Sequence, residues 1–316
     1  MQPRVYVDGQ EGTTALRIRD WLAWRSDLEL IVLPHARRKD PEARREAMAA
    51  ADVVVLCLPD DAAREAATWA MKIGTRVIDA STAHRVHPDW VYGLPELGPE
   101  QEAAIRGAQR VANPGCYATG FVLLLRPLID AGLVDAEAPV VCHALSGYSG
   151  GGRALIERWE DPERGLASLP FEAPYALQRV HKHVPEMMRY TGLRLEPYFE
   201  PAVGPFRCGM RVQIPLHARL LRGSPRDVWE ALATRYEGQR FVRLEPYSEN
   251  GDLDEHALSP LACNDTNRVW LHAIPHPSGH VLLVAILDNL GKGAGGAAIQ
   301  NLNLMLGLPG DTGLPA

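Results

Sequence analysis

The first third of this 316-residue chain alternates short apolar strands with helical segments, and this alternation restricts the possible folds more than any other feature. The predicted strands cover residues 4–8, 28–33, 52–58, 76–80 and 110–114. The predicted helices cover residues 13–24, 41–50, 60–73 and 99–108. The strands are apolar on both faces, as strands are when helices cover both sides of a parallel sheet. We therefore expect a Rossmann-like, parallel-sheet α/β domain in this part of the chain.

The middle of the chain has a different pattern. Its apolar runs, separated by Pro, Gly and Ser, are "APVVCHAL", "FRCGMRVQIPLHARL", "FVRLEPY", "RVWLHAI" and "HVLLVAILD". Such runs predict a mostly antiparallel sheet, and "PHPSG" between the last two predicts a hairpin. One helix interrupts them at "SPRDVWEALATRY", where Ser224 is the expected N-cap and Pro225 the first helical residue. An α+β domain is therefore expected here, and the pattern becomes helical again from about Ala294.

Composition restricts the partners. The formal net charge is −6 and no basic block is present, which argues against a nucleic-acid or anionic-membrane surface. No stretch approaches the roughly 20 apolar residues that span a bilayer, and the N-terminus lacks a signal-like apolar segment. We therefore expect a cytoplasmic protein that acts on small molecules. The five cysteines are odd in number and widely spaced without a CxxC pair, so neither a disulfide framework nor a metal site is expected.

The first strand is followed by "VDGQEGTTALRI", with small residues at Gly9, Gly12 and Ala15. Small residues at such a turn let backbone amides approach a pyrophosphate at the N-terminus of the next helix. We predict a dinucleotide site formed by Gly9, Gly12, Thr13 and Thr14. The alternative is a tight turn into a helix without a ligand.

The second strand leads into the basic segment "PHARRKD". A site for NAD usually has an acidic residue near this point, which binds the ribose 2′-hydroxyl. Arg37, Arg38 and Lys39 favour NADP instead, because guanidinium groups pair well with a 2′-phosphate. The alternative is a solvated cluster of charges at the start of a helix.

Cys116 differs from the other cysteines because it lies between a Pro-Gly turn and an apolar, helical run in "NPGCYATG". A helix N-terminus lowers the pKa of a thiol and favours the nucleophilic thiolate. The remaining cysteines, two of them inside apolar runs, are interpreted as structural; they are Cys57, Cys142, Cys208 and Cys263.

A histidine pair in "HKHVPEM" is the candidate acid/base. The residue before Pro185 favours extended geometry, which would project His181 and His183 to one face. The alternatives are a metal-binding pair, a pair of surface histidines, and a Cys116 that is only structural.

Five stretches together resemble the N-acetyl-γ-glutamyl-phosphate reductase family in its shorter bacterial form, within the aspartate-semialdehyde dehydrogenase superfamily. They are "VDGQEGTTALRI", "IDASTAHRV", "ANPGCYATG", "HKHVPEM" and "DNLGKGAGGAAIQNLN", and "SGYSGGGR" is a sixth. They occur in the family's order and span nearly the whole chain. The sequence departs from the family at Ala15, where glycine is usual, and at "SGGGR", where "SGAGR" is common.

The resemblance implies NADPH-dependent reduction of N-acetyl-γ-glutamyl phosphate to N-acetylglutamate semialdehyde, with release of phosphate, in arginine biosynthesis. Cys116 would form a thioester, and His181 or His183 would handle the protons. A homodimer or homotetramer formed through the antiparallel sheet is implied as well. The implied domains are an NADP-binding domain at 1–115 and 290–316, and a catalytic and dimerisation domain at 116–289.

The resemblance also implies roles for further residues. Arg85 and Asn113 would bind the acyl-phosphate group, and Arg153 would pair with the substrate carboxylate. Additional contacts with the cofactor are expected from Ser81, Ser146, Gly147 and Asn289. The alternatives are a surface arginine for Arg85, a turn-forming side chain for Asn113, and a solvated loop lysine for Lys292.

Two other functions are compatible with the sequence. The nearer one is a sister acyl-phosphate reductase, such as aspartate-semialdehyde dehydrogenase or an enzyme with a carrier-bound substrate. The more distant one is an NADP-binding sensor without turnover, which would need neither Cys116 nor the histidine pair. Activity with a panel of semialdehydes separates these possibilities.

Overall fold

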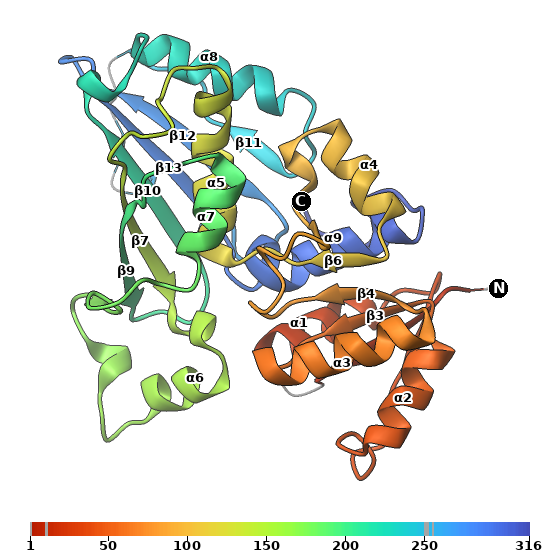
Figure 1. The fold of residues 1–316 in the computed structure, drawn as a ribbon. Helices are drawn as coiled ribbons and strands as arrows, with labels where there is room; N and C mark the ends of the chain where they lie inside the picture. The colour runs from red at the N-terminus through yellow and green to blue at the C-terminus, as the bar shows by residue number, and fades with distance from the viewer. Residues whose placement is uncertain (1, 10–11, 250–252, 255) are drawn as a thin grey trace. The chain divides into compact units, whose positions relative to one another are not determined.

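The computed structural model describes residues 2–9, 12–249, 253–254 and 256–316. The chain forms two compact units (Figure 1). The first unit contains Met1–Pro114 and Ala294–Pro315, and the second contains Gly115–Gly293 and Ala316. Compared with the expected domains, Gly115, residues 290–293 and Ala316 belong to the second unit instead of the first.

The first unit is built on a six-stranded sheet in which every pairing is parallel, as predicted. Its strands are β1 (Arg4–Asp8), β2 (Glu29–Ile31), β3 (Val53–Leu56), β4 (Arg76–Asp79), β5 (Val91–Tyr92) and β6 (Arg110–Ala112). The sheet order is β2-β1-β3-β4-β6-β5. The chain leaves β1 toward one edge and returns to β3 on the other side. The carboxyl ends of β1 and β3 therefore form a topological switch point, where doubly wound sheets bind ligands.

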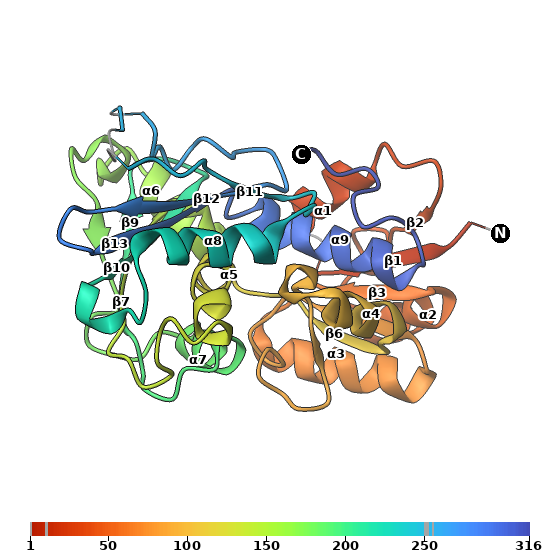
Figure 2. The same ribbon diagram turned by 90° about the horizontal axis from the view of Figure 1, so that it is seen from above.

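Helices cover both faces of this sheet. They are α1 (Thr13–Leu22), α2 (Pro41–Ala50), α3 (Asp60–Ile73), α4 (Pro99–Gly107) and α9 (Gly296–Met305), with a short 3-10 helix at Pro95–Leu97. Helix α2 packs against α3, whereas α9 packs against α1 and α4 on the opposite face (Figure 2). The closing helix thus completes the first unit, which makes that unit discontinuous in sequence.

The second unit contains a seven-stranded, mostly antiparallel sheet, which confirms the predicted class. Its strands are β7 (Val141–Gly147), β8 (Ala173–Pro174), β9 (Tyr198–Gly204), β10 (Met210–Leu216), β11 (Val242–Leu244), β12 (Val269–Pro275) and β13 (Val281–Leu287). The predicted hairpin is the antiparallel pair β12 and β13. Among the described strands of this sheet, two pairs are parallel: β7 with β9, and β11 with β12.

Four α-helices are described in this unit: α5 (Cys116–Asp130), α6 (Arg153–Glu160), α7 (Val184–Thr191) and α8 (Pro225–Tyr236). Short 3-10 helices lie at Tyr148–Gly151, Leu166–Ser168 and Ala218–Leu220, and a π-helical turn at Gly291–Gly295 leads into α9. Helix α8 begins at the predicted Ser224 cap, where Ser224 and Asp227 form a capping box. Helix α5 is almost entirely buried and packs against β10, β13, α7 and α8.

The interpretation of Lys292 as a solvated loop lysine is wrong, because the side chain is fully buried and its ammonium lies 5.9 Å from the ring centre of Phe241. None of the helices in the described ranges combines the length and apolarity needed to cross a membrane.

Candidate active site

Cys116 is the first residue of α5, the position that the Pro-Gly turn predicts. Gly115 is the extended N-cap, and its carbonyl accepts the first helical hydrogen bond from Thr119 at 2.8 Å. The Gly115 N–H donates to Oε1 of the buried Glu186 of α7 at 2.6 Å. This bond fixes the point at which α5 begins. The half-buried Cys116 thiol therefore lies beside the first-turn amides, which favour its thiolate form.

The remaining thiols lie in different surroundings. Burial raises the pKa of Cys57 and of Cys142 far above the ordinary value, and burial raises the pKa of Cys263 to about 11. Cys208 is half-buried, with its sulfur 3.4 Å from the Ser149 hydroxyl oxygen. A protonated thiol is a poor nucleophile, so Cys57, Cys142 and Cys263 are unsuited to covalent catalysis at neutral pH.

The histidine pair is held in a turn, and the expected extended segment is wrong. His183 has φ −87° and ψ −12° and is the N-cap of α7, while the Val184 N–H donates to the His181 carbonyl. Pro185 is accommodated because it lies in the first helical turn, where a missing N–H costs no hydrogen bond. The two imidazoles are nevertheless neighbours, with ring centres 4.8 Å apart.

A chain of hydrogen bonds positions His181. Its Nδ1 accepts the backbone N–H of His183 at 3.2 Å, so the neutral ring carries its proton on Nε2. This Nε2 lies 3.3 Å from the Tyr175 hydroxyl, which donates to the Tyr117 hydroxyl at 3.3 Å. Burial raises the pKa of Tyr117 well above 10 and that of Tyr175 to about 12, so both phenols stay protonated near neutral pH. Tyr117 directly follows Cys116, so this cluster adjoins the candidate nucleophile.

The two predicted phosphate-binding residues are brought together in the first unit. Both are buried, and the Arg85 Nε donates to the Asn113 backbone carbonyl at 3.0 Å. The Asn113 amide is in turn fixed, because its Nδ2 donates to the Ala294 carbonyl and its Oδ1 accepts from Asn301. Asn113 thus holds the arginine through its backbone and is itself held by the closing helix segment.

Ser146, Gly147 and Asn289 also lie together, at one end of the antiparallel sheet. Met210 of β10 pairs with Ser146 on one side and with Leu287 on the other, so β7 and β13 end at the same end of the sheet, with the start of β10 between them. Asn289 is buried, accepts from the Gly209 N–H at 2.8 Å and donates to the Ser149 hydroxyl at 2.9 Å. A side chain at position 147 would lie 2.4 Å from the Arg207 carbonyl oxygen, so only glycine fits there.

The predicted pyrophosphate turn lies at the switch point of the first unit. Gly9 follows β1 with φ +93°, and a Cβ there would lie 2.2 Å from the Cys57 carbonyl oxygen. Gly12 is the N-cap of α1, with Thr13 and Thr14 half-buried in the first turn. Among the described residues, no side chain caps this helix, and its first turn holds no acidic residue. These features suit an anion; Gln10 and Glu11 of the motif lie outside the described residues.

The basic segment forms a turn between β2 and α2. Arg37 and Lys39 are exposed and Arg38 is half-buried. Arg37 lies 3.8 Å from the Asp40 carboxylate and 3.5 Å from that of Glu46. These distances describe loose surface pairs, which a stronger anion such as a phosphate can replace.

Known proteins share both the sequence and the fold of this chain. A Pseudomonas putida protein named N-acetyl-gamma-glutamyl-phosphate reductase 2 is 50% identical over 308 residues, covering 96% of this chain and 97% of its own. A Nostoc protein of the same name is 45% identical and covers 99% of both chains. The chain belongs to the N-acetyl-γ-glutamyl-phosphate reductase family. Membership in this family makes it an oxidoreductase, and the family resemblance predicted from the motifs is confirmed.

Domain families and solved structures agree with this family. Residues 34–105 match the semialdehyde dehydrogenase NAD binding domain, and residues 116–289 match the semialdehyde dehydrogenase dimerisation domain. Aspartate semialdehyde dehydrogenase II from Vibrio cholerae superposes with a TM-score of 0.71 at 17% identity, covering 97% of this chain and 98% of its own. An aspartate semialdehyde dehydrogenase from Candida albicans, solved with NADP, has a TM-score of 0.62 at 15% identity, over 97% and 99% of the two chains. At such identities the likeness concerns the fold alone.

Two residues that the family resemblance suggested have less specific surroundings. Ser81 is buried after β4, where its hydroxyl donates to Asp79 at 2.8 Å and stabilises the loop. Arg153 is exposed at the start of α6 and pairs with Glu157 at 2.7 Å. An exposed pair four residues apart on a helix is common surface electrostatics.

Several residues of the site were missed at the sequence level. Tyr117, Tyr175 and Glu186 come together only through tertiary packing, although Tyr117 and Glu186 lie inside recognised motifs. Arg44 was also missed: it binds the buried Asp8 at the end of β1 through two nitrogens, at 3.1 and 2.8 Å. A carboxylate directly after the first apolar strand was the signal for this pair.

Proposed function

We propose that this protein reduces N-acetyl-γ-glutamyl phosphate to N-acetylglutamate semialdehyde with NADPH, through a thioester on Cys116. The observation that carries the proposal is the half-buried thiol at the start of α5, beside a hydrogen-bonded histidine and tyrosine cluster. Relatives that match this chain over nearly their whole length are named for this activity. One of them is a Burkholderia lata protein at 48% identity.

In the first half of the reaction, the Cys116 thiolate attacks the γ-carbonyl carbon. A carbon–sulfur bond forms, the carbon–oxygen bond to phosphate breaks, and inorganic phosphate leaves. The first-turn amides of α5 stabilise the anionic sulfur before the attack. We assign Arg85 and Asn113 to the phosphate group, because a guanidinium and an amide N–H supply the donors that a doubly charged leaving group needs.

In the second half, the thioester is reduced and released. NADPH, when bound, would supply a hydride to the thioester carbon. A histidine of the pair gives its proton to the carbonyl oxygen, so that the hydride and the proton together convert the thioester into a thiohemiacetal. The histidine pair then removes the hydroxyl proton as the carbon–sulfur bond breaks, which yields the aldehyde and restores the thiolate. Splitting the reaction at a covalent intermediate lowers the barrier of each part.

The first unit fits the nucleotide. The start of α1 lies at the switch point, where its first-turn amides suit the pyrophosphate, and we assign Gly9, Gly12, Thr13 and Thr14 to it. Arg37, Arg38 and Lys39 are assigned to the 2′-phosphate, which makes NADP the cofactor. We assign Ser81, Ser146, Gly147 and Asn289 to further cofactor contacts.

The experiment that tests this function has two parts. The purified protein is assayed for phosphate-dependent NADP reduction with N-acetylglutamate semialdehyde and aspartate semialdehyde, and the acyl adduct is trapped and located by mass spectrometry. We expect turnover with the acetylated substrate and one adduct, on Cys116, that is absent in Cys116→Ser. Preference for aspartate semialdehyde would support the sister enzyme, and cofactor binding without turnover would support a sensor.

The family also leads us to propose a homodimer or homotetramer that acts in the cytoplasm, without nucleic-acid or membrane partners. The match of residues 116–289 to a dimerisation domain supports self-association through the second unit. Light scattering at several protein concentrations measures the oligomeric state, and a monomer at micromolar concentration would contradict this part of the proposal.

A further inference from the structure

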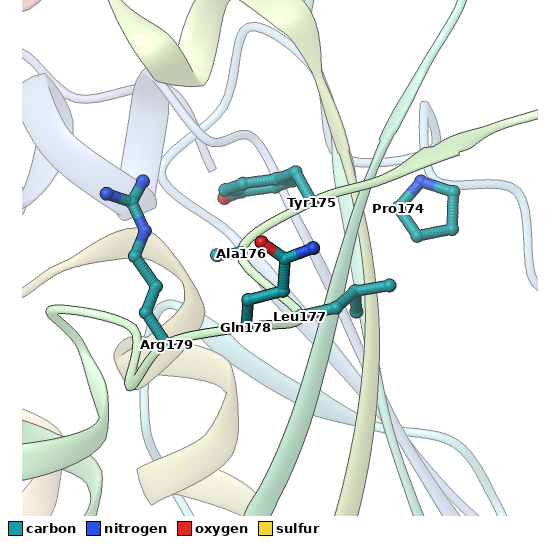
Figure 3. Close-up of a pocket in the computed structure, with 6 residues that line it drawn as sticks. All are labelled: Pro174, Tyr175, Ala176, Leu177, Gln178 and Arg179. Atoms are coloured by element: carbon teal, nitrogen blue, oxygen red, sulfur yellow. The ribbon is translucent and has the colours of Figure 1, made fainter.

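A pocket of about 460 Å³ lies in the segment just before the histidine pair (Figure 3). It belongs to the second unit, and its lining runs from the end of β8 along the chain. The lining residues are Pro174, Tyr175, Ala176, Leu177, Gln178 and Arg179. One continuous stretch therefore supplies both the pocket and, two residues later, His181 of the acid/base cluster.

The backbone of this stretch is held in an unfavourable conformation. Ala176 has φ +57°, in the left-handed region that residues with a Cβ rarely adopt. The Arg179 N–H donates to the Ala176 carbonyl at 3.3 Å and closes the turn. Backbone strain of this kind persists where the surroundings enforce it, often at ligand-binding positions. The turn thereby fixes the start of the Arg179 side chain against the pocket.

The lining of the pocket has a polar side, with a positive charge, and an apolar side. In Figure 3 the Arg179 guanidinium and the Tyr175 hydroxyl point to the same side, and Pro174 and Leu177 lie on the other. Arg179 is exposed, and within the described part of the chain it forms no ion pair. Several other arginines of the same unit pair with a carboxylate, among them Arg153 with Glu157, Arg164 with Asp161 and Arg207 with Glu160. The charge of Arg179 is therefore available to an anionic ligand.

Tyr175 connects this pocket to the candidate nucleophile. Its hydroxyl lies 3.3 Å from the hydroxyl of Tyr117, the neighbour of Cys116, and 3.3 Å from Nε2 of His181. Burial is the main cause that raises the pKa of Tyr175 to about 12. Smaller contributions come from the hydrogen bond with Tyr117, which lowers this pKa, and from the charges of Cys116 and Arg179, which raise and lower it respectively. The sulfur and the guanidinium therefore both act on the same phenol.

We propose that this pocket binds the acetamido-carboxylate end of the acyl substrate, with the Arg179 guanidinium paired to the α-carboxylate. The inference rests on the proposed function, because that substrate joins its reacting carbonyl to a carboxylate and an amide through a short chain. A planar guanidinium matches a carboxylate in charge and geometry. Arg179 then takes the role that the family resemblance suggested for Arg153, whose guanidinium is already paired.

The test compares two substrates and two variants. N-acetylglutamate semialdehyde carries the α-carboxylate, and 4-acetamidobutanal is the same aldehyde without it. Arg179→Met should lower kcat/KM for the first substrate by about 10- to 100-fold, mostly through KM, as expected for a lost hydrogen bond between charged groups. It should leave the low activity with 4-acetamidobutanal unchanged. Arg179→Lys should restore part of the loss.

Arg153→Met is the matched control, since it removes an exposed arginine from the same unit. We expect it to leave both activities within about two-fold, as for an exposed helix pair of small energy. An equal loss on both substrates in Arg179→Met, or a carboxylate-specific loss in Arg153→Met, would overturn the proposal. Absence of wild-type turnover of N-acetylglutamate semialdehyde would instead overturn the proposed function, and this inference with it. The thermal unfolding temperature of each variant shows whether a loss of activity comes from a loss of folded protein.

Discussion

Gly293 lies directly against Cys116: a Cβ built on Gly293 would be 2.7 Å from the Cβ of Cys116. Glycine is the only residue that permits this approach, because real side-chain carbons do not come so close. The backbone is fixed as well, since the Gly293 N–H donates to the Asp288 carbonyl at 2.9 Å. Gly293 of "DNLGKGAGG" thus makes room for Cys116, the proposed nucleophile.

Gly293→Ala should therefore displace Cys116. We expect a fall in kcat of about 100-fold, because a shift of about 1 Å in a reacting group has effects of this size. Overpacking should also lower the free energy of unfolding by about 1–3 kcal/mol. Gly107→Ala is the control, since nothing lies within 4 Å of a Cβ at that position. Full activity in Gly293→Ala would show that the packing at Cys116 is not needed for catalysis.

The thiols should differ in reactivity with pH. Burial raises the pKa of Cys142 and Cys263, so these groups stay protonated as the pH rises through 8, and only the thiolate is alkylated. We expect iodoacetamide at pH 7.5 to label Cys116 first in the native protein, and to label Cys142 and Cys263 only after unfolding. Peptide mapping by mass spectrometry measures the order. Native labelling of Cys142 at the rate of Cys116 would contradict the assignment of the nucleophile.

The two histidines should respond differently to substitution. His181 is half-buried with Nε2 at hydrogen-bond distance from Tyr175, whereas His183 is buried with its ring centre 5.7 Å from that of Tyr117. His181→Asn should lower kcat by about 100- to 10,000-fold with little change in stability, as for loss of a general acid/base. His183→Asn should lower the unfolding temperature by several degrees. The opposite pattern in kinetics and calorimetry would make His183 the acid/base.

Local sequence signals predicted most regular elements of the first unit, but they missed strand β9 and helices α6 and α7 of the second unit. Helix α2 covers Pro41–Ala50 as expected, because Asp40 caps it and Pro41 fits its first turn. The two-residue strand β5 was missed, since it is too short to show alternation. The predicted extended segment at His181 was wrong, because the Pro185 rule favours extended residues only where the proline does not begin a helix.

The site was predictable only where it lies inside one motif. Cys116 and the turn before it follow from a few consecutive residues. The bond from Tyr175 to Tyr117 joins residues 58 apart, and that from Gly115 to Glu186 joins residues 71 apart. Such pairs depend on strand order and helix packing, which local patterns do not encode. The same reason explains why the buried Lys292 resembled a loop residue in the sequence.

Cofactor preference should depend on the basic turn after β2. The double variant Arg37→Ala and Arg38→Ala should raise KM for NADPH by about 10-fold, since charge-assisted contacts to the 2′-phosphate are lost. KM for NADH should change little. Arg64→Ala is the control, because Arg64 is exposed in the same unit and pairs only with Asp61 among the described residues. Equal effects on both cofactors would refute the assignment of the 2′-phosphate.

Asn301 of α9 should affect phosphate binding without touching phosphate. Its Nδ2 donates to the Gly93 carbonyl at 3.0 Å and to Asn113 Oδ1 at 3.1 Å, and the Asn113 carbonyl accepts from Arg85. Asn301→Leu keeps the volume but removes these bonds, so the free energy of unfolding should fall by about 1–3 kcal/mol. Because Asn113 and Arg85 are then less firmly positioned, KM for phosphate should rise by about 10-fold.

Asn303→Leu is the matched control for this prediction. Asn303 is equally buried on the same helix, but it donates to the Gly310 and Thr312 carbonyls and accepts from Arg25. Within the described residues it makes no hydrogen bond to Asn113. It should cost similar stability and leave KM for phosphate unchanged. Denaturant unfolding and phosphate-dependent NADP reduction measure the two quantities separately. If both variants change KM for phosphate equally, Asn301 acts only through general stability, and its positioning of Asn113 is refuted.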